Sequence, residues 1–188
     1  MKPITIVIAD GYSDWEIAPL AGVGRAFYGA DIRFTSPEGG TVTSVAGLRM
    51  ADTDRFEAPD DGVVVVCGGP AFEGETAPDL GQRLKEARRN GCVIAGICGG
   101  TIALARAGLL DEVRHTSNGP QYLGQFAQPY QGAANYVEQP MALRDRDIIT
   151  AAAPMPASFA MEVLIAAGLD KDKAAEIPAM LSNEHKAG

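Results

Sequence analysis

Residues 93–105, VIAGICGGTIALA, decide the fold of this chain. Residues 93–97 are apolar and rich in β-branched side chains, which predicts a buried strand. Two glycines follow Cys98 and helical spacing resumes after them, so the segment predicts a strand, a sharp turn and a helix. The turn places the thiol at the end of a sheet, where the amides that open the helix favour its thiolate. Cys98 is therefore the first candidate nucleophile, and a structural cysteine is the alternative.

Strands and helices alternate along the rest of the chain. We expect strands at 3–9, 32–35, 63–67, 93–97, 114–117, 136–138 and 147–151, and helices at 14–28, 79–90, 101–107, 119–128 and 157–167. Residues 41–50 predict a small hairpin or flap. This alternation predicts an α/β sandwich of three layers, with a mostly parallel sheet and helices on both faces. One domain over residues 1–170 would be followed by a partly helical tail at 171–188.

Composition narrows the possible partners and compartments. The chain of 188 residues carries 16 basic and 24 acidic side chains, with a formal charge of −8. Because no basic cluster stands out, we expect neither nucleic acid nor an anionic membrane as a partner. No signal peptide or membrane-spanning segment is recognised. Three cysteines argue against a disulfide framework, so Cys67 and Cys92 are predicted to be buried and the protein to be cytoplasmic. No Cys/His spacing resembles a zinc site, and no metal or cofactor is expected.

Three strand ends carry groups that belong together chemically. Residues 10–16 follow the first strand, the turn 68–70 follows the Val-rich strand, and Cys98 follows the third. Sites in open α/β sheets lie at such carboxyl ends. The thiol would be the nucleophile, and the N–H groups of Gly69 and Gly99 would stabilise an oxyanion. Glu16 would hold or exchange a proton with sulfur, which requires burial to raise its pKa, whereas a charged Glu16 would repel a thiolate. The alternative for Glu16 is a solvated helix residue, and Asp14 is most simply an N-cap.

These residues resemble the ThiJ/PfpI superfamily, which has the class I glutamine amidotransferase-like fold. The matching segments are GYSDWE (11–16), GGP (68–70), AGICGGT (95–101), GLLD (108–111) and IITA (148–151). The resemblance implies a flavodoxin-like sandwich with a nucleophile elbow, usually as a homodimer. It implies Cys98 as the reactive thiol, Glu16 hydrogen-bonded to it, and an oxyanion site at Gly69 and Gly99.

The chain departs from that superfamily in its histidines. Many members carry a histidine directly after the nucleophile, where this chain has Gly99. Others place one after the elbow helix, and there the family pattern aligns Asn118 rather than His115. His115 stays a candidate catalytic or orienting group, since histidine is the usual base near neutral pH. Its alternative is a structural histidine, and Asp14 and Asn118 are further candidate binding residues.

The resemblance implies a cysteine-dependent hydrolase or lyase that acts on a small molecule. Amidotransferase-like, isonitrile hydratase-like and glyoxalase-like reactions all occur in the superfamily, which fixes architecture better than substrate. One alternative is a redox or stress sensor, or a chaperone, that uses an oxidisable Cys98 without turnover. Another is a glutaminase domain that works with a synthetase partner.

Overall fold

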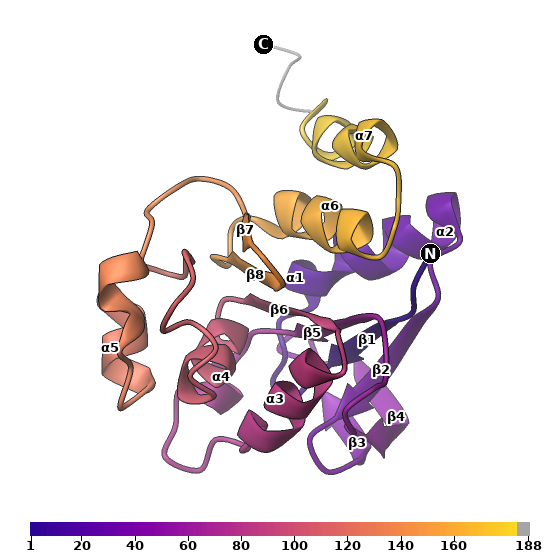
Figure 1. Ribbon diagram of the computed structural model, residues 1–188. Helices are drawn as coiled ribbons and strands as arrows, with labels where there is room; N and C mark the ends of the chain where they lie inside the picture. Colours follow the sequence, from indigo (N-terminus) through magenta and orange to yellow (C-terminus); the bar gives the residue numbers. More distant parts are fainter. Residues whose placement is uncertain (184–188) are drawn as a thin grey trace.

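The central feature of the molecule is an eight-stranded mixed sheet with the order β3-β4-β2-β1-β5-β6-β8-β7, seen in the computed structural model, which describes residues 1–183 (Figure 1). The six central strands are parallel, and β3 and β7 are antiparallel edge strands. The strands are β1 (Ile4–Val7), β2 (Ile32–Ser36), β3 (Gly40–Thr43), β4 (Arg49–Arg55), β5 (Val63–Val66), β6 (Val93–Ile97), β7 (Leu143–Asp145) and β8 (Ile148–Ala151).

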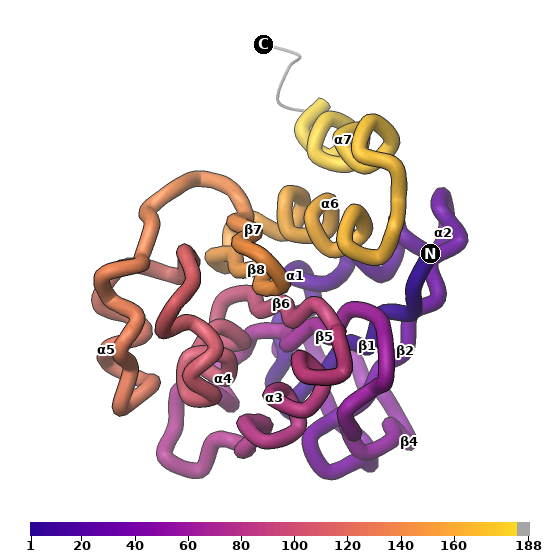
Figure 2. The backbone as a smooth tube through the Cα atoms, in the orientation of Figure 1, coloured from indigo at the N-terminus to yellow at the C-terminus, as the bar shows by residue number. Residues whose placement is uncertain are grey.

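Helices cover both faces of this sheet, so the predicted flavodoxin-like α/β fold is confirmed. One face carries α1 (Asp14–Ala18), α2 (Gly24–Tyr28), α6 (Pro156–Ala166) and α7 (Lys171–Leu181), and the other carries α3 (Gly81–Arg89), α4 (Gly100–Arg106) and α5 (Tyr122–Phe126) (Figure 1, Figure 2). Shorter helical segments are η1 (Pro19–Val23), η2 (Pro70–Phe72) and η3 (Gly132–Asn135). No helix within residues 1–183 has the length and apolarity of a membrane span.

The Val-rich strand β5 explains why the sheet is buried on both sides. Val65 packs into the core under α6, whereas Val64 and Val66 pack into the core under α3 and α4. All four valines of β5 are buried, because successive side chains point to opposite faces and helices cover both. A continuous apolar run is the sequence pattern that this arrangement requires.

The first helical region begins and ends where it was predicted, but the face that it buries is not the one predicted. Gly29 ends it with φ 64°, as expected for a helix stop. The apolar side chains that suggested the helix include Trp15 and Phe27, which are exposed, while Glu16 and Ile17 point inward. The π-helical segment η1 separates α1 from α2, so one helical phase does not carry through.

Two short strands were predicted wrongly and one was missed. The segments 114–117 and 136–138 form only a single parallel bridge, between His115 and Tyr136. The edge strand β7 was not predicted, because three residues are too few to show an alternating pattern. The expected hairpin at 41–50 is confirmed as β3 and β4, and β4 continues to Arg55 and pairs with β2 in parallel.

The expected C-terminal helix lies at Lys171–Leu181 and packs on α6. Its Ala174 and Ile177 are fully buried, and Ile177 joins the core on the α6 face. Asp170 caps this helix by accepting hydrogen bonds from the N–H groups of residues 172 and 173. The remainder of the predicted tail, residues 184–188, lies outside the described residues.

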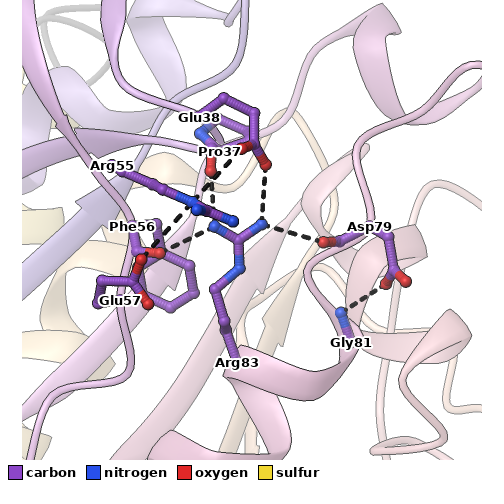
Figure 3. Close-up of polar contacts among 8 residues, drawn as sticks. All are labelled: Pro37, Glu38, Arg55, Phe56, Glu57, Asp79, Gly81 and Arg83. Carbon is purple, nitrogen blue, oxygen red and sulfur yellow. Dashed lines mark hydrogen bonds and ion pairs between the residues drawn. The ribbon is translucent and has the colours of Figure 1, made fainter.

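Arg83 on α3 ties together the connections that follow β2 and β4 (Figure 3). Its Nη1 donates to the carbonyls of Pro37 and Phe56 at 2.6 and 2.9 Å, and its Nη2 donates to the Glu38 carboxylate at 3.1 Å and to the Asp79 carbonyl at 3.3 Å. The Arg83 side chain is only 15% exposed. Carbonyls that no strand pairs are thus satisfied by one charged side chain, which stabilises this end of the sheet.

Candidate active site

The candidate site lies where the connections of neighbouring strands leave the sheet in opposite directions. The chain passes from β1 to β2 on one side of β1, and β5 and β6 lie on the other side. Such a switch point opens a crevice at the carboxyl ends of the strands. Hydrogen bonds close the loops on one another there: Ser13 N–H donates to the Gly68 carbonyl at 3.1 Å, and Gly68 N–H donates to Glu16 Oε2 at 2.8 Å. Two of the three strand ends therefore meet as predicted.

Cys98 forms the predicted elbow between β6 and α4. It has φ 53°, in the left-handed region that is strained for a residue with a side chain. Its N–H donates to the Ala151 carbonyl at 2.9 Å, and its carbonyl accepts from Thr101 Oγ1 at 2.6 Å, which holds the turn at both ends. Cys98 is partly exposed, whereas Cys67 and Cys92 are buried, as predicted. The elbow therefore presents the least buried thiol of the chain.

Glu16 lies against the same turn as the thiol. A Cβ built on Gly68 would overlap Glu16 Oε2 and lie 2.6 Å from Cys98 Cβ, so only a glycine leaves room for the pair. Glu16 is 0% exposed, and burial raises the pKa of its carboxyl to about 7 against the opposing effects of the Cys98 thiol and the Gly68 N–H. Its Oε1 makes no hydrogen bond of normal geometry within residues 1–183. Glu16 is thus a buried acid that exchanges its proton near neutral pH.

The pKa of the Cys98 thiol is raised to about 11, first by burial and then by the charge of Glu16. This direction is opposite to the one expected from the helix start, because burial outweighs the N–H groups that favour the thiolate. Asn118 and the Gly99 N–H act in the other direction. Since the two groups interact, thiol and carboxyl titrate as one coupled pair. A protonated Glu16 removes the repelling charge and makes the thiolate easier to form.

Gly69 and Gly99 pack against each other beside the sulfur. Gly69 has φ 141°, and a Cβ there would lie 2.6 Å from the Gly11 carbonyl. A Cβ on Gly99 would lie 2.5 Å from the Gly69 carbonyl. Within residues 1–183 neither N–H donates to a backbone carbonyl. Two backbone donors close to a nucleophile are the ingredients of an oxyanion site.

Asn118, not His115, contacts the sulfur. Asn118 Nδ2 donates to Cys98 Sγ at 3.2 Å, and its Oδ1 accepts from Ala153 N–H at 2.9 Å, which fixes the amide orientation. His115 is fully buried, with Nδ1 at 2.8 Å from the Val113 carbonyl and Nε2 bonded to the Tyr130 hydroxyl. Both ring nitrogens are therefore occupied away from the thiol. Among the described residues the geometry supports a structural histidine and gives no Cys-His-Glu triad.

Asp14 is placed at the hairpin rather than at the thiol. Its Oδ2 accepts from Ala46 N–H at 3.1 Å, which ties the β3–β4 turn to α1. Ser13 occupies the N-cap position that was expected for Asp14. No contact of the described residues joins Asp14 to Cys98, so its part in the site is to hold the neighbouring loop.

A cleft of about 650 Å³ opens on the side of Asn118 that faces β8. It is lined by residues 116–119, Tyr136, residues 138–140 and residues 152–155. Ser117 connects this cleft to the elbow, because its Oγ lies 2.7 Å from Thr101 Oγ1. Sequence reasoning gave no role to Ser117 or to Thr101, the last residue of the AGICGGT segment, because only the fold brings the two hydroxyls together. No cluster of three His, Cys, Asp or Glu side chains in the described part of the chain is suited to a metal ion.

Comparisons with known proteins show one family and several similar chains. A family model described as the DJ-1/PfpI family matches residues 2–166. The solved structure of the DJ-1 superfamily protein Atu0886 from Agrobacterium tumefaciens is 35% identical with a TM-score of 0.90, over 98% of this chain and 100% of that one.

Two curated relatives from Bacillus subtilis (strain 168) are also similar. The uncharacterized protease YdeA is 29% identical over 87% of this chain and 82% of its own length. The uncharacterized protease YoaZ is 29% identical over 65% of this chain, and the match spans 60% of that relative.

Proposed function

The chain belongs to the DJ-1/PfpI family, and we propose that it is a cysteine-dependent hydrolase or lyase whose Cys98 attacks a small electrophilic molecule. One observation carries the proposal: the loops after β1, β5 and β6 bring together the Cys98 thiol, the buried Glu16 carboxyl and two backbone N–H groups. Each of these groups is common on its own. Gly68 leaves space for the thiol and the carboxyl side by side, which points to chemistry between these two.

The first step is addition of sulfur to an electrophilic carbon. Glu16, whose pKa is raised to about 7, is partly ionised at neutral pH and accepts the thiol proton as Sγ forms its bond to carbon. The electron pair of the substrate C=O bond moves to oxygen, where the N–H groups of Gly69 and Gly99 stabilise the charge. Protonated Glu16 then returns the proton to that oxygen or to a leaving group. A pKa near the working pH lets one carboxyl serve in both directions.

Asn118 and the adjoining cleft would orient the two reactants. The Asn118 amide donates to sulfur and is itself held by the Ala153 N–H. The 650 Å³ cleft beside it is of the size that holds small ligands. Two relatives are named as proteases, and attack on an amide carbonyl needs the same nucleophile and donors. Amides, isonitriles and methylglyoxal are therefore the compounds to screen first.

The test is turnover by the wild-type protein and by Cys98→Ser on a substrate found in that screen. We expect the variant to lose at least about a hundredfold in kcat/KM, because serine is a far weaker nucleophile without a strong base. Circular dichroism would check that the variant folds. Full turnover by folded Cys98→Ser protein would refute nucleophilic catalysis by this residue.

A second candidate function is a redox or stress sensor that uses Cys98. It is supported by the difference in burial between Cys98 and the buried Cys67 and Cys92. Mild peroxide followed by peptide mapping should then oxidise Cys98 at least about tenfold faster than the other two. Equal oxidation of the three cysteines would contradict a sensor role.

We further propose a homodimer in a reducing, cytoplasmic environment. Trp15 on α1 and Val45 and Leu48 in the β3–β4 turn are exposed, and the bond between Asp14 and Ala46 brings the two segments together. An exposed apolar patch of this kind is typical of an interaction surface. Three unpaired cysteines agree with a reducing compartment. Sedimentation of wild-type protein and Leu48→Lys would test the dimer, which the variant should weaken.

A further inference from the structure

A hydrogen bond joins two loops beside the candidate site, and the mechanism proposed above gives it no role. The Tyr122 hydroxyl, at the start of α5, donates to Glu73 Oε1 at 2.6 Å. Glu73 directly follows η2, the helical turn that begins after Gly69, and Tyr122 lies four residues after Asn118. The two segments joined by this bond therefore contact the Cys98 turn at their other ends. We call these two linked loops, residues 70–74 and 118–122, the rim of the site.

A second link holds the same two segments together. Arg106, at the end of α4, donates to the Phe126 carbonyl at 2.7 and 3.1 Å and to the Gly74 carbonyl at 3.4 Å. The pKa of the Tyr122 hydroxyl is raised, first by burial, then by Glu73 and by the charge of Cys98. The sulfur and the Glu73 carboxylate thus act on one hydroxyl, which places Glu73 within electrostatic reach of the thiol.

Acidic side chains lie beside the thiol, at the rim and in the cleft. Glu16 lies beside the Cys98 turn, Glu73 bonds to Tyr122, and Glu138 is the one charged side chain among the described residues that line the cleft. Arg106 is the cation attached to the rim. It lies eight residues beyond Cys98, about 12 Å from it along the axis of α4, and its guanidinium donates to the carbonyls of Phe126 and Gly74.

We propose that Glu73, held in place by Tyr122, is a specificity-determining residue that excludes anionic substrates from Cys98. The site would accordingly take neutral or cationic electrophiles, such as simple carbonyl compounds and amides, and reject those that carry a carboxylate near the reacting carbon. A substrate carboxylate would approach the exposed carboxylates of Glu73 and Glu138, and like charges repel, most strongly at low salt. This inference rests on the proposed role of Cys98 as the nucleophile.

Iodoacetamide and iodoacetate test the inference without a known substrate, because they are similar in size and differ by one negative charge. The alkylation rate of Cys98 would be measured by mass spectrometry with peptide mapping at low salt, and each rate divided by that of 2-mercaptoethanol, which carries no carboxylate, with the same reagent. We expect the normalised rate for iodoacetamide to exceed that for iodoacetate by about tenfold. Glu73→Gln should lower this ratio to about threefold, Glu73→Lys should lower it further, and 1 M salt should reduce the ratio of the wild-type protein.

The control is Glu75→Gln, which removes the same charge from an exposed residue of the same loop, and it should leave the ratio unchanged. A wild-type ratio near one, or an equal effect of Glu75→Gln and Glu73→Gln, would overturn the inference. Tyr122→Phe keeps the Glu73 charge but frees the side chain, and an intermediate ratio is expected. The absolute rate with iodoacetamide, and its loss in Cys98→Ser, tests the proposed function separately, and the ratio can be measured even when both rates are slow.

Discussion

Replacement of Glu16 by glutamine should change how the stability of this protein depends on pH. Glu16 is fully buried, and its pKa is raised from 4.5 to about 7 by that burial. Glutamine has nearly the same shape, can accept the Gly68 N–H at the same position and carries no titrating proton. The variant therefore removes the charge but keeps the packing.

The size and sign of the effect follow from the two pKa values. Between pH 4.5 and 7 the unfolded chain has already lost the Glu16 proton while the folded chain still holds it, so the free energy of unfolding falls as pH rises. Since one pKa unit corresponds to about 1.4 kcal/mol, the loss is about 3 kcal/mol in total, of which about 2.5 kcal/mol falls between pH 5 and 8. Below pH 4.5 this stabilisation is fully present.

The assay is urea unfolding at pH 5 and pH 8. Every protein compared carries Cys98→Ser, so that the neighbouring thiol does not titrate, and 'wild type' here means wild type at position 16. From pH 5 to pH 8 the free energy of unfolding should fall by about 2.5 kcal/mol more in the protein with Glu16 than in the variant with glutamine. All other carboxyls cancel in this comparison. Glu86→Gln, at an exposed position of α3, makes the same chemical change and should leave the pH dependence as in wild type.

The reasoning would be refuted if wild type and Glu16→Gln changed equally, within about 0.5 kcal/mol, between pH 5 and 8. Glu16 would then titrate like a solvated carboxyl and could not hold a proton at neutral pH. The acid–base role proposed for it would fall with that result.

Three further predictions concern the sulfur, the sheet end and the elbow. Asn118→Asp should slow alkylation of Cys98 by iodoacetamide at pH 8 by about tenfold, because a donor to sulfur becomes a charge that raises the thiol pKa; an unchanged rate would contradict the contact. Arg83→Ala should lower the free energy of unfolding in urea by about 2–3 kcal/mol, since it leaves carbonyls and a carboxylate without their shared donor. Gly100→Ala should cost more than about 3 kcal/mol or prevent folding, because its Cβ would overlap the β5 backbone, whereas Gly22→Ala, which has open space around its Cβ, should be neutral or stabilising by up to about 1 kcal/mol in the same assay.

The fold could be predicted from sequence where a local pattern of residues is compatible with only one structure. The apolar runs of β5 and β6 required helices on both faces, and the glycines after Cys98 required a tight turn before α4. Prediction failed for residues 114–117, where the Thr116 N–H donates to the Thr150 hydroxyl of β8 instead of to a backbone carbonyl, and one bridge replaces a ladder. It also failed for the exposed face of α1, because Trp15 suggested a buried stripe while the site required Glu16 inside.

The sequence by itself determined the parallel sheet, the elbow and the position of the thiol, because all three depend on neighbouring residues and on local conformational preferences. Only the tertiary structure decided which groups reach that thiol. Glu16 bonds to a glycine 52 positions away, and Asn118 bonds to a sulfur 20 positions away, while His115 is taken up by Val113 and Tyr130. Hydrogen-bond partners and desolvation depend on segments brought together by folding, and these two effects set the protonation of the site.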